Sequence, residues 1–178
     1  MKDKVLIVID MQNDFVTGCL GSHEAQSIIP AVKEKVEQYD DGDCSIFYTR
    51  DTHKKDYLNT HEGKYLPVEH CIENSAGWHI IPELDKQREE LYNATNIINK
   101  PTFGYPAWGA VLPPYITQIE LCGVCTDICV ISQALILRAL YPEVDIVVDA
   151  KCCAGVTPEK HKAALEVMKS CQISVIND

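Results

Sequence analysis

The sequence has no long apolar run and no excess of basic residues. No apolar segment approaches the roughly 20 residues that a membrane-spanning helix needs. The 16 Lys and Arg residues are outnumbered by 26 Asp and Glu residues, and the net charge of −10 argues against a nucleic-acid partner, because phosphate binding needs a basic surface. The first residues also lack the apolar core and cleavage site of a signal peptide. We therefore expect a cytoplasmic protein that binds neither membrane nor nucleic acid.

Linkers, internal repeats and low-complexity stretches are missing as well. A chain of 178 residues without such breaks is expected to form one domain, residues 1–178. The hydrophobic fraction of 46% and the charged fraction of 24% are ordinary for a globular protein. Length and composition therefore predict a single globular domain but do not indicate a function.

Short β-rich apolar segments alternate with longer amphipathic ones. The expected strands are residues 5–9, 45–49, 96–99, 118–122, 145–149 and 173–176. The expected helices are residues 25–39, 127–140 and 158–170. The nearly continuous apolar character of the first strand suits a strand that is buried on both faces of a parallel sheet. The pattern predicts an α/β protein with an open, mostly parallel sheet and helices on both faces.

Reactive side chains follow three of the expected strands. Ligands of such sheets bind beyond the carboxyl ends of the strands, where Asp10, Lys100 and Cys129 are expected. A carboxylate can accept the proton of a thiol, and an ammonium can stabilise a thiolate. Cys129 also falls in the expected first turn of a helix, where backbone N–H groups favour a thiolate and can bind an oxyanion. These residues are a candidate catalytic set with Cys129 as the nucleophile.

The chain has nine cysteines, and most are expected to be small, buried apolar residues. Cys122 and Cys125 form a CxxC pair. Such a pair is typical of redox and metal-binding proteins, so a function of that kind stays open as an alternative to hydrolysis. However, Cys122 falls inside an expected strand, and no second CxxC completes a four-cysteine site.

Three segments resemble the isochorismatase-like cysteine hydrolases. They are VIDMQNDF at 8–15, KPTFG at 100–104 and GVCTDICV at 123–130, and the resemblance covers nearly the whole chain. It implies a Rossmann-like, three-layer α/β/α domain with a six-stranded, mostly parallel sheet. It also implies that Asp10, Lys100 and Cys129 form a catalytic triad.

The same resemblance describes the turn before Cys129. It implies a non-proline cis peptide bond between Val124 and Cys125. It also implies an oxyanion hole made by the backbone amides of Cys125 and Cys129.

A second group of side chains looks like the metal site of the nicotinamidase and pyrazinamidase branch. Asp51, His53 and His70 offer carboxylate and imidazole donors that suit zinc, iron or manganese. A further ligand comes from either His61 or Glu62, which are adjacent, and we favour Glu62. The resemblance thus implies a divalent metal, with zinc as first choice, which holds the pyridine nitrogen of a bound carboxamide.

The branch also implies a reaction, the hydrolysis of nicotinamide to nicotinate and ammonia through a thioester on Cys129. We expect Phe15, Tyr105 and Trp108 to bind the substrate, and copies of the chain to associate as a homo-oligomer. Pro67 stands where nicotinamidases often have an aromatic residue. This departure leaves open another small amide, or an isochorismate-like vinyl ether, as the substrate.

Overall fold

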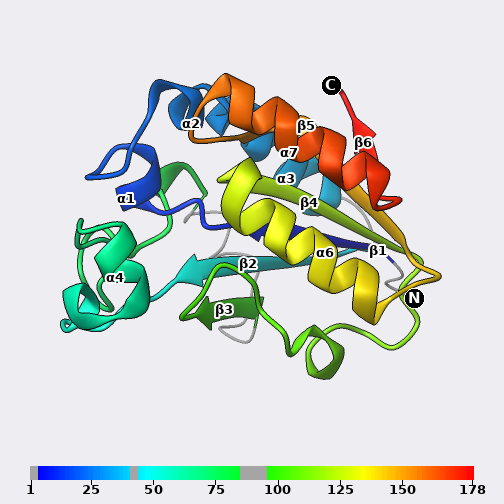
Figure 1. The fold of residues 1–178 in the computed structure, drawn as a ribbon. Coiled ribbons are helices and arrows are strands. Elements are labelled where there is room, and N and C mark those ends of the chain that lie inside the picture. Colours follow the sequence, from blue (N-terminus) through cyan, green and yellow to red (C-terminus); the bar gives the residue numbers. More distant parts are fainter. Residues whose placement is uncertain (1–3, 41–43, 85–95) are drawn as a thin grey trace.

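The computed structural model describes residues 4–40, 44–84 and 96–178, in which six strands form one sheet (Figure 1). The strands are β1 Lys4–Ile9, β2 Ser45–Asp51, β3 Ile97–Lys100, β4 Gln118–Val124, β5 Asp145–Ala154 and β6 Ser174–Ile176. Their order is β3-β2-β1-β4-β5-β6, and every neighbouring pair is parallel. The α/β class and the six-stranded sheet are thereby confirmed.

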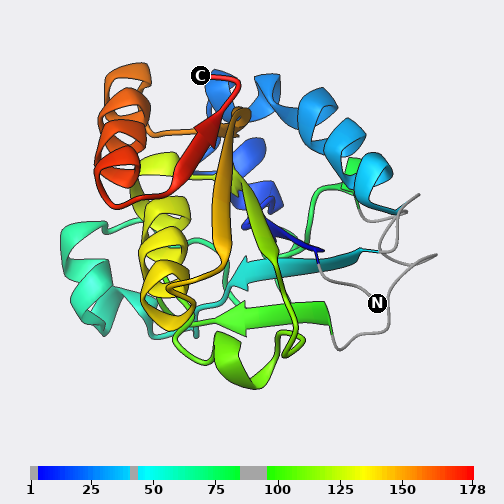
Figure 2. The ribbon, with the colours of Figure 1, turned by 90° about the vertical axis from the view of Figure 1, so that its right-hand side faces the viewer.

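Helices cover both faces of the sheet. They are α1 Asn13–Val16, α2 His23–Ser27, α3 Ile29–Asp40, α4 His61–Tyr65, α6 Ile131–Leu140 and α7 Pro158–Ser170. Figure 2 shows α6 and α7 on one side of the sheet and α3 on the other. The short helices α1 and α4 lie beyond the carboxyl ends of the central strands, at the left of Figure 1. The expected three-layer arrangement is therefore present.

The single helix expected over residues 25–39 is instead two helices, so this prediction was wrong. Ser22 caps α2, its hydroxyl accepting the N–H of Ala25, and the helix ends at Ile28. Pro30 is the second residue of α3, where proline fits the first turn of a new helix but could not continue an old one.

Strands β4 and β5 are longer than expected and reach the site. β5 continues through Ala154 because Cys153 and Ala154 pair with Gly123 and Val124, after a register shift in β4. Gly123 has φ of +118°, and a Cβ there would lie 2.1 Å from the carbonyl oxygen of Ile9. Only glycine allows β1 and β4 to approach this closely at their carboxyl ends.

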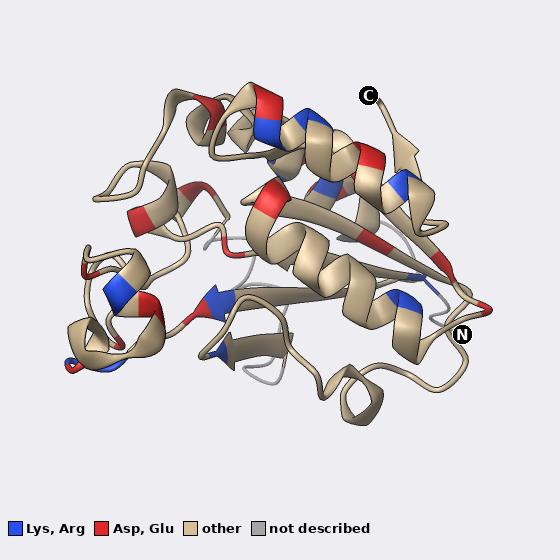
Figure 3. Cartoon of the chain, in the orientation of Figure 1, with Lys and Arg blue, Asp and Glu red and all other residues tan. Residues whose placement is uncertain are grey.

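Charged residues are dispersed over the surface. In the view of Figure 3, the Lys and Arg positions of the described residues stand among Asp and Glu positions and form no basic band. None of the helices in the described ranges has the length and apolar character of a membrane span.

Candidate active site and metal centre

Asp10 and Cys129 lie near the point where the strand order changes direction. β1 and β4 are neighbours at the centre of the sheet, with β2 and β3 on one side and β5 and β6 on the other. Such a switch point opens a crevice at the carboxyl ends of the strands. Asp10 directly follows β1, and the turn with Cys129 follows β4.

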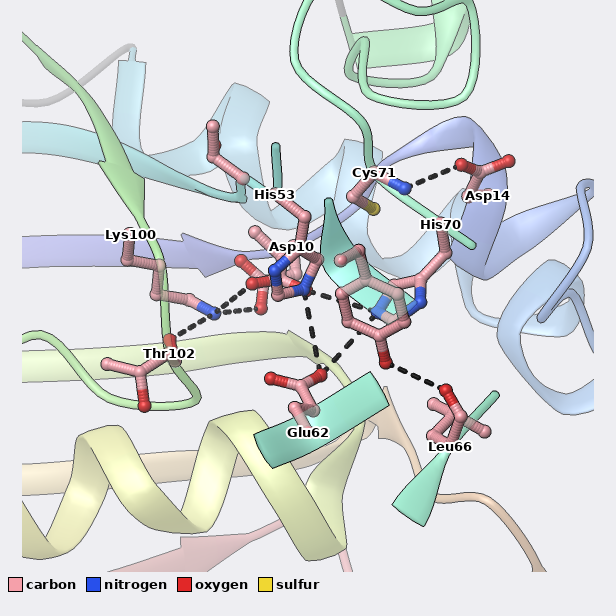
Figure 4. Close-up of polar contacts among 12 residues, drawn as sticks. Asp10, Asp14, His53, Glu62, Leu66, His70, Cys71, Lys100 and Thr102 are labelled. Carbon is pink, nitrogen blue, oxygen red and sulfur yellow. Dashed lines mark hydrogen bonds and ion pairs between the residues drawn. The ribbon is translucent and has the colours of Figure 1, made fainter. Parts of the chain in front are cut away.

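Asp10, Lys100 and Cys129 come together in the interior. The Nζ atom of Lys100 is 2.6 Å from Oδ2 of Asp10 and 3.7 Å from Sγ of Cys129. Lys100 also donates to the carbonyl of Thr102 (Figure 4). The Thr49 hydroxyl donates a 2.6 Å hydrogen bond to Oδ1 of Asp10. All three candidate residues are buried, so water does not screen these charges.

Burial determines the protonation of this trio. It raises the pKa of the Cys129 thiol well above its ordinary value, Asp10 adds to the rise, and Lys100 opposes it. Burial also raises the pKa of Asp10, against the opposing ammonium of Lys100. Burial lowers the pKa of Lys100, but Asp10, Cys129 and Asp51 outweigh it, so the pKa rises. These directions favour a neutral Cys129 thiol over the thiolate suggested by its place near a helix start, and they make the carboxylate of Asp10 a stronger base than an exposed one.

The turn between β4 and α6 presents the thiol. Residues Thr126–Val130 form a wide π-helical turn, in which the carbonyl of Cys125 accepts the N–H groups of Ile128 and Val130. The peptide bond between Val124 and Cys125 is cis, as the resemblance implied. The amide of Cys129 lies within this turn, and that of Cys125 directly precedes it.

Two contacts that the sequence did not suggest tie this turn to the start of α7. The hydroxyl of Thr126 lies 2.8 Å from Nδ1 of His161, and Oδ1 of Asp127 accepts the N–H of Val156 at 2.9 Å. Both are long-range pairs between segments with no shared periodicity or motif, so nothing in the sequence reveals them.

The four favoured metal ligands form a second cluster beside the trio. One ligand atom from each of Asp51, His53, Glu62 and His70 lies within 4.8 Å of the others. Oδ2 of Asp51 is 2.9 Å from Nε2 of His53 and 3.4 Å from Nε2 of His70. Oε1 of Glu62 is 3.6 and 3.7 Å from the same two nitrogens (Figure 4).

This donor set fits a divalent metal. Nδ1 of His70 donates to the carbonyl of Val68 at 2.8 Å, which leaves Nε2 of the neutral ring with a lone pair that faces the carboxylates. Oδ1 of Asp51 is buried and accepts no hydrogen bond. A bound cation, or protons on the ring nitrogens, can satisfy these converging oxygen and nitrogen atoms, and two imidazoles with two carboxylates suit zinc, iron or manganese.

The local fold distinguishes between His61 and Glu62. The Thr60 hydroxyl caps α4 by accepting the N–H of Gly63, and the helix turns Glu62 toward the cluster. The ring of His61 instead packs against Tyr65, with 5.0 Å between centroids, and lines a second cavity of about 530 Å³.

A cavity of about 520 Å³ opens onto both clusters. Cys129, Asp51, Glu62 and His70 contribute to its wall. Phe15 lines it too, and its ring centroid is 5.5 Å from that of His70. Phe15 therefore lines the cavity beside one of the candidate metal ligands.

The structure does not bring Tyr105 and Trp108 to this cavity, contrary to the expectation that they bind substrate. Trp108 is fully buried and donates its indole N–H to Oε1 of Gln133 at 2.8 Å. Tyr105 donates its backbone N–H to the same oxygen, and its ring packs edge-on against Trp108. Gln133 thus anchors both residues on α6, whereas Phe103 of the same segment does line the cavity.

The CxxC pair does not form a disulfide, and all nine cysteines are free. Burial raises the pKa of Cys122 well above its ordinary value and that of Cys125 to about 12. Reactive dithiols need a lowered thiol pKa, so this geometry gives no support to a redox role.

Comparison with known proteins agrees with this arrangement. The family model of the isochorismatase domain matches residues 4–177. A nicotinamidase of Schizosaccharomyces pombe is 27% identical over 207 residues, which cover 97% of this chain and 92% of that protein.

Solved structures with the same fold include nicotinamidase PncA from Bacillus subtilis, with a TM-score of 0.83, 26% identity and coverage of 97% of this chain and 98% of that one. The pyrazinamidase of Pyrococcus horikoshii in complex with zinc has a TM-score of 0.79 and 25% identity, with 99% of each chain covered.

Proposed function

Since this chain belongs to the isochorismatase family and is a hydrolase of that superfamily, we propose that it cleaves the C–N amide bond of nicotinamide, releasing nicotinate and ammonia. One observation carries the proposal: the cavity that Cys129 lines is also lined by Asp51, Glu62 and His70 of the metal-ligand cluster. A carboxamide on a pyridine ring has an electrophilic carbon for the thiol and a ring nitrogen for a metal.

The first half of the reaction forms a thioester. Asp10 takes the proton of the Cys129 thiol as Sγ adds to the carboxamide carbon. The ammonium of Lys100, 2.6 Å from Asp10 and 3.7 Å from the sulfur, stabilises the negative charge as it moves between them. The backbone N–H groups of Cys125 and Cys129 donate to the tetrahedral oxyanion.

The second half releases both products. The C–N bond breaks as Asp10 returns its proton to the nitrogen, and ammonia leaves. Asp10 then takes a proton from a water molecule, which attacks the thioester carbon. The C–S bond breaks, Cys129 recovers a proton, and the carboxylic acid departs.

Asp51, His53, Glu62 and His70 would hold a divalent metal, with zinc preferred and iron or manganese as alternatives. When bound, the metal supplies a Lewis-acid anchor for the pyridine nitrogen. Phe15 packs against the ring from the side of His70, so that the ring is fixed while the carboxamide faces Sγ.

Ammonia release from nicotinamide by the metal-loaded protein tests the proposal, with a panel of small amides and isochorismate as alternative substrates. A nicotinoyl adduct on Cys129, found by mass spectrometry after rapid acid quench, identifies the thioester. Cys129→Ala should abolish both signals. The matched control is Cys171→Ala, since Cys171 is a half-buried cysteine that directly follows α7 as its C-cap residue. Full amidase activity in Cys129→Ala would refute the mechanism.

A further inference from the structure

The cavity is larger than the proposed substrate needs. A carboxamide on one six-membered ring has about nine non-hydrogen atoms, which at the roughly 30 Å³ that liquid water takes per molecule need at most about 270 Å³. The cavity has about 520 Å³. Cavities of that size accept ligands of several rings or long substituents. A single ring and a metal ion together therefore leave part of the space unfilled.

Four of the residues that line this space carry the chemical groups: Asp51, Glu62, His70 and Cys129. Three of these four belong to the metal-ligand cluster. The rest of the wall is mainly apolar and includes Leu20, Ala25, Tyr65, Leu66, Ile128 and Val156. Among the described lining residues remote from both clusters, Ser22 and Lys160 are the ones with a polar side chain other than a thiol or phenol. The part of the cavity that the ring leaves free thus has few hydrogen-bonding side chains for a polar substituent.

Large apolar side chains gather at this cavity while remaining exposed to solvent. The exposed fractions are 81% for Tyr65, 37% for Leu66, 41% for Phe103 and 45% for Val156. They come from α4 and its end, the segment after β3 and the turn before α7, three parts of the chain that are far apart in sequence. Exposed apolar residues that are scattered need no explanation, but a cluster of them marks a binding surface.

We propose that the preferred substrate is a carboxamide whose ring carries an apolar substituent of several carbons on the side away from the carboxamide. This inference rests on the proposed amidase function and adds what the substrate must carry. The substituent occupies the part of the cavity that the ring leaves free and removes Tyr65, Leu66 and Val156 from water. Each buried methylene group is worth about fourfold in affinity.

A homologous series of pyridine-3-carboxamides tests this inference. The ring position meta to the carboxamide carries hydrogen, methyl, propyl or phenyl, and kcat/KM is measured with the metal-loaded enzyme. We expect kcat/KM to rise at least about tenfold from hydrogen to propyl. Tyr65→Ser and Val156→Ser should each lower the ratio of propyl to hydrogen severalfold. The matched controls Tyr115→Ser and Val167→Ser change residues that are 75% and 48% exposed and line neither described cavity, so the ratio should hold.

Three results would overturn the inference. The first is a propyl-to-hydrogen ratio of kcat/KM of one or less, and the second is an equal loss of that ratio in the control variants. The third is a preference for a substituent of the same length that ends in a carboxylate and pairs with Lys160. If no amide is hydrolysed, the proposed function fails by itself. Calorimetric binding of the matching carboxylic acids to the metal-loaded protein then decides the inference. Binding of the propyl acid at least about tenfold tighter than nicotinate supports it, and equal affinity overturns it.

Discussion

The ammonium of Lys100 and the carboxylate of Asp10 form a fully buried ion pair 2.6 Å long. Removing one partner of such a pair leaves an uncompensated charge away from water. We therefore predict that Lys100→Met lowers the free energy of unfolding by about 3–5 kcal/mol, measured by urea denaturation. The double variant Asp10→Asn/Lys100→Met should recover part of that stability. The introduced asparagine can also accept a hydrogen bond from the Thr49 hydroxyl, and asparagine tolerates the φ of 49° at this position. The double variant should nevertheless stay inactive.

Lys54→Met is the matched control for this prediction. Lys54 pairs with Glu73, but its side chain is 72% exposed, so the loss should be below about 1 kcal/mol. Equal losses in Lys54→Met and Lys100→Met would contradict the assignment of Lys100 to a buried pair.

Removal of the metal should abolish activity reversibly. Dialysis against a chelator is expected to remove about one metal equivalent, counted by elemental analysis, and added zinc, iron or manganese should restore ammonia release. Glu62→Gln should weaken metal affinity about 10- to 100-fold, because the cluster loses a charged ligand. The neighbouring His61→Gln should retain wild-type affinity. Full activity without stoichiometric metal would eliminate the metal centre.

Gly123 is expected to resist substitution. Its φ of +118° and the 2.1 Å approach of a built Cβ to the Ile9 carbonyl mean that alanine must strain the backbone and separate β1 from β4. Gly123→Ala should cost at least about 2 kcal/mol of unfolding free energy. Gly109→Ala is the control, since a Cβ there meets nothing within 4 Å. Similar thermal denaturation of the two variants would argue against this account.

Asp149 should make stability depend on acid pH. Although burial raises its pKa, the ammonium of Lys35 at 2.8 Å and the amide of Asn177 outweigh burial and lower it. A lowered pKa in the folded state means that the stabilisation is present above the unfolded pKa of about 3.9 and is lost as pH falls through the folded value. The difference in unfolding free energy between the wild type and Asp149→Asn should be about 2 kcal/mol at neutral pH and should shrink toward pH 3. A difference independent of pH would refute this.

The sequence predicted the sheet well, because alternating patterns and short motifs are local signals, but β4 and β5 extend beyond the ends expected for them. Asp10, Lys100 and Cys129 each follow or end a strand whose apolar run is readable, and the parallel sheet then brings those ends to one edge. Pro30 is a local signal for the break between α2 and α3, but the apolar periodicity on both sides of it predicts one continuous helix.

The sequence pattern could not predict which side chains of the irregular segments point into the cavity and which into the core. Phe103 and Trp108 belong to one irregular segment, and only the hydrogen bond from Trp108 to Gln133 on α6 decides which of them enters the core. The partnership of Thr126 with His161 likewise depends on how α7 packs. The cytoplasmic location and the homo-oligomer stay predictions.

Lys100 is the last residue of β3, a strand of four residues that forms the outer edge of the sheet and pairs with β2. Outer strands with few ladder bonds open locally at lower free energy than central ones. In the proposed mechanism, the charge that stabilises the reaction at Cys129 thus depends on an outer part of the sheet, while Asp10 and Cys129 follow its centre. Inactivation by urea should therefore precede the loss of circular dichroism, so that the enzyme fails as a catalyst while it is still folded.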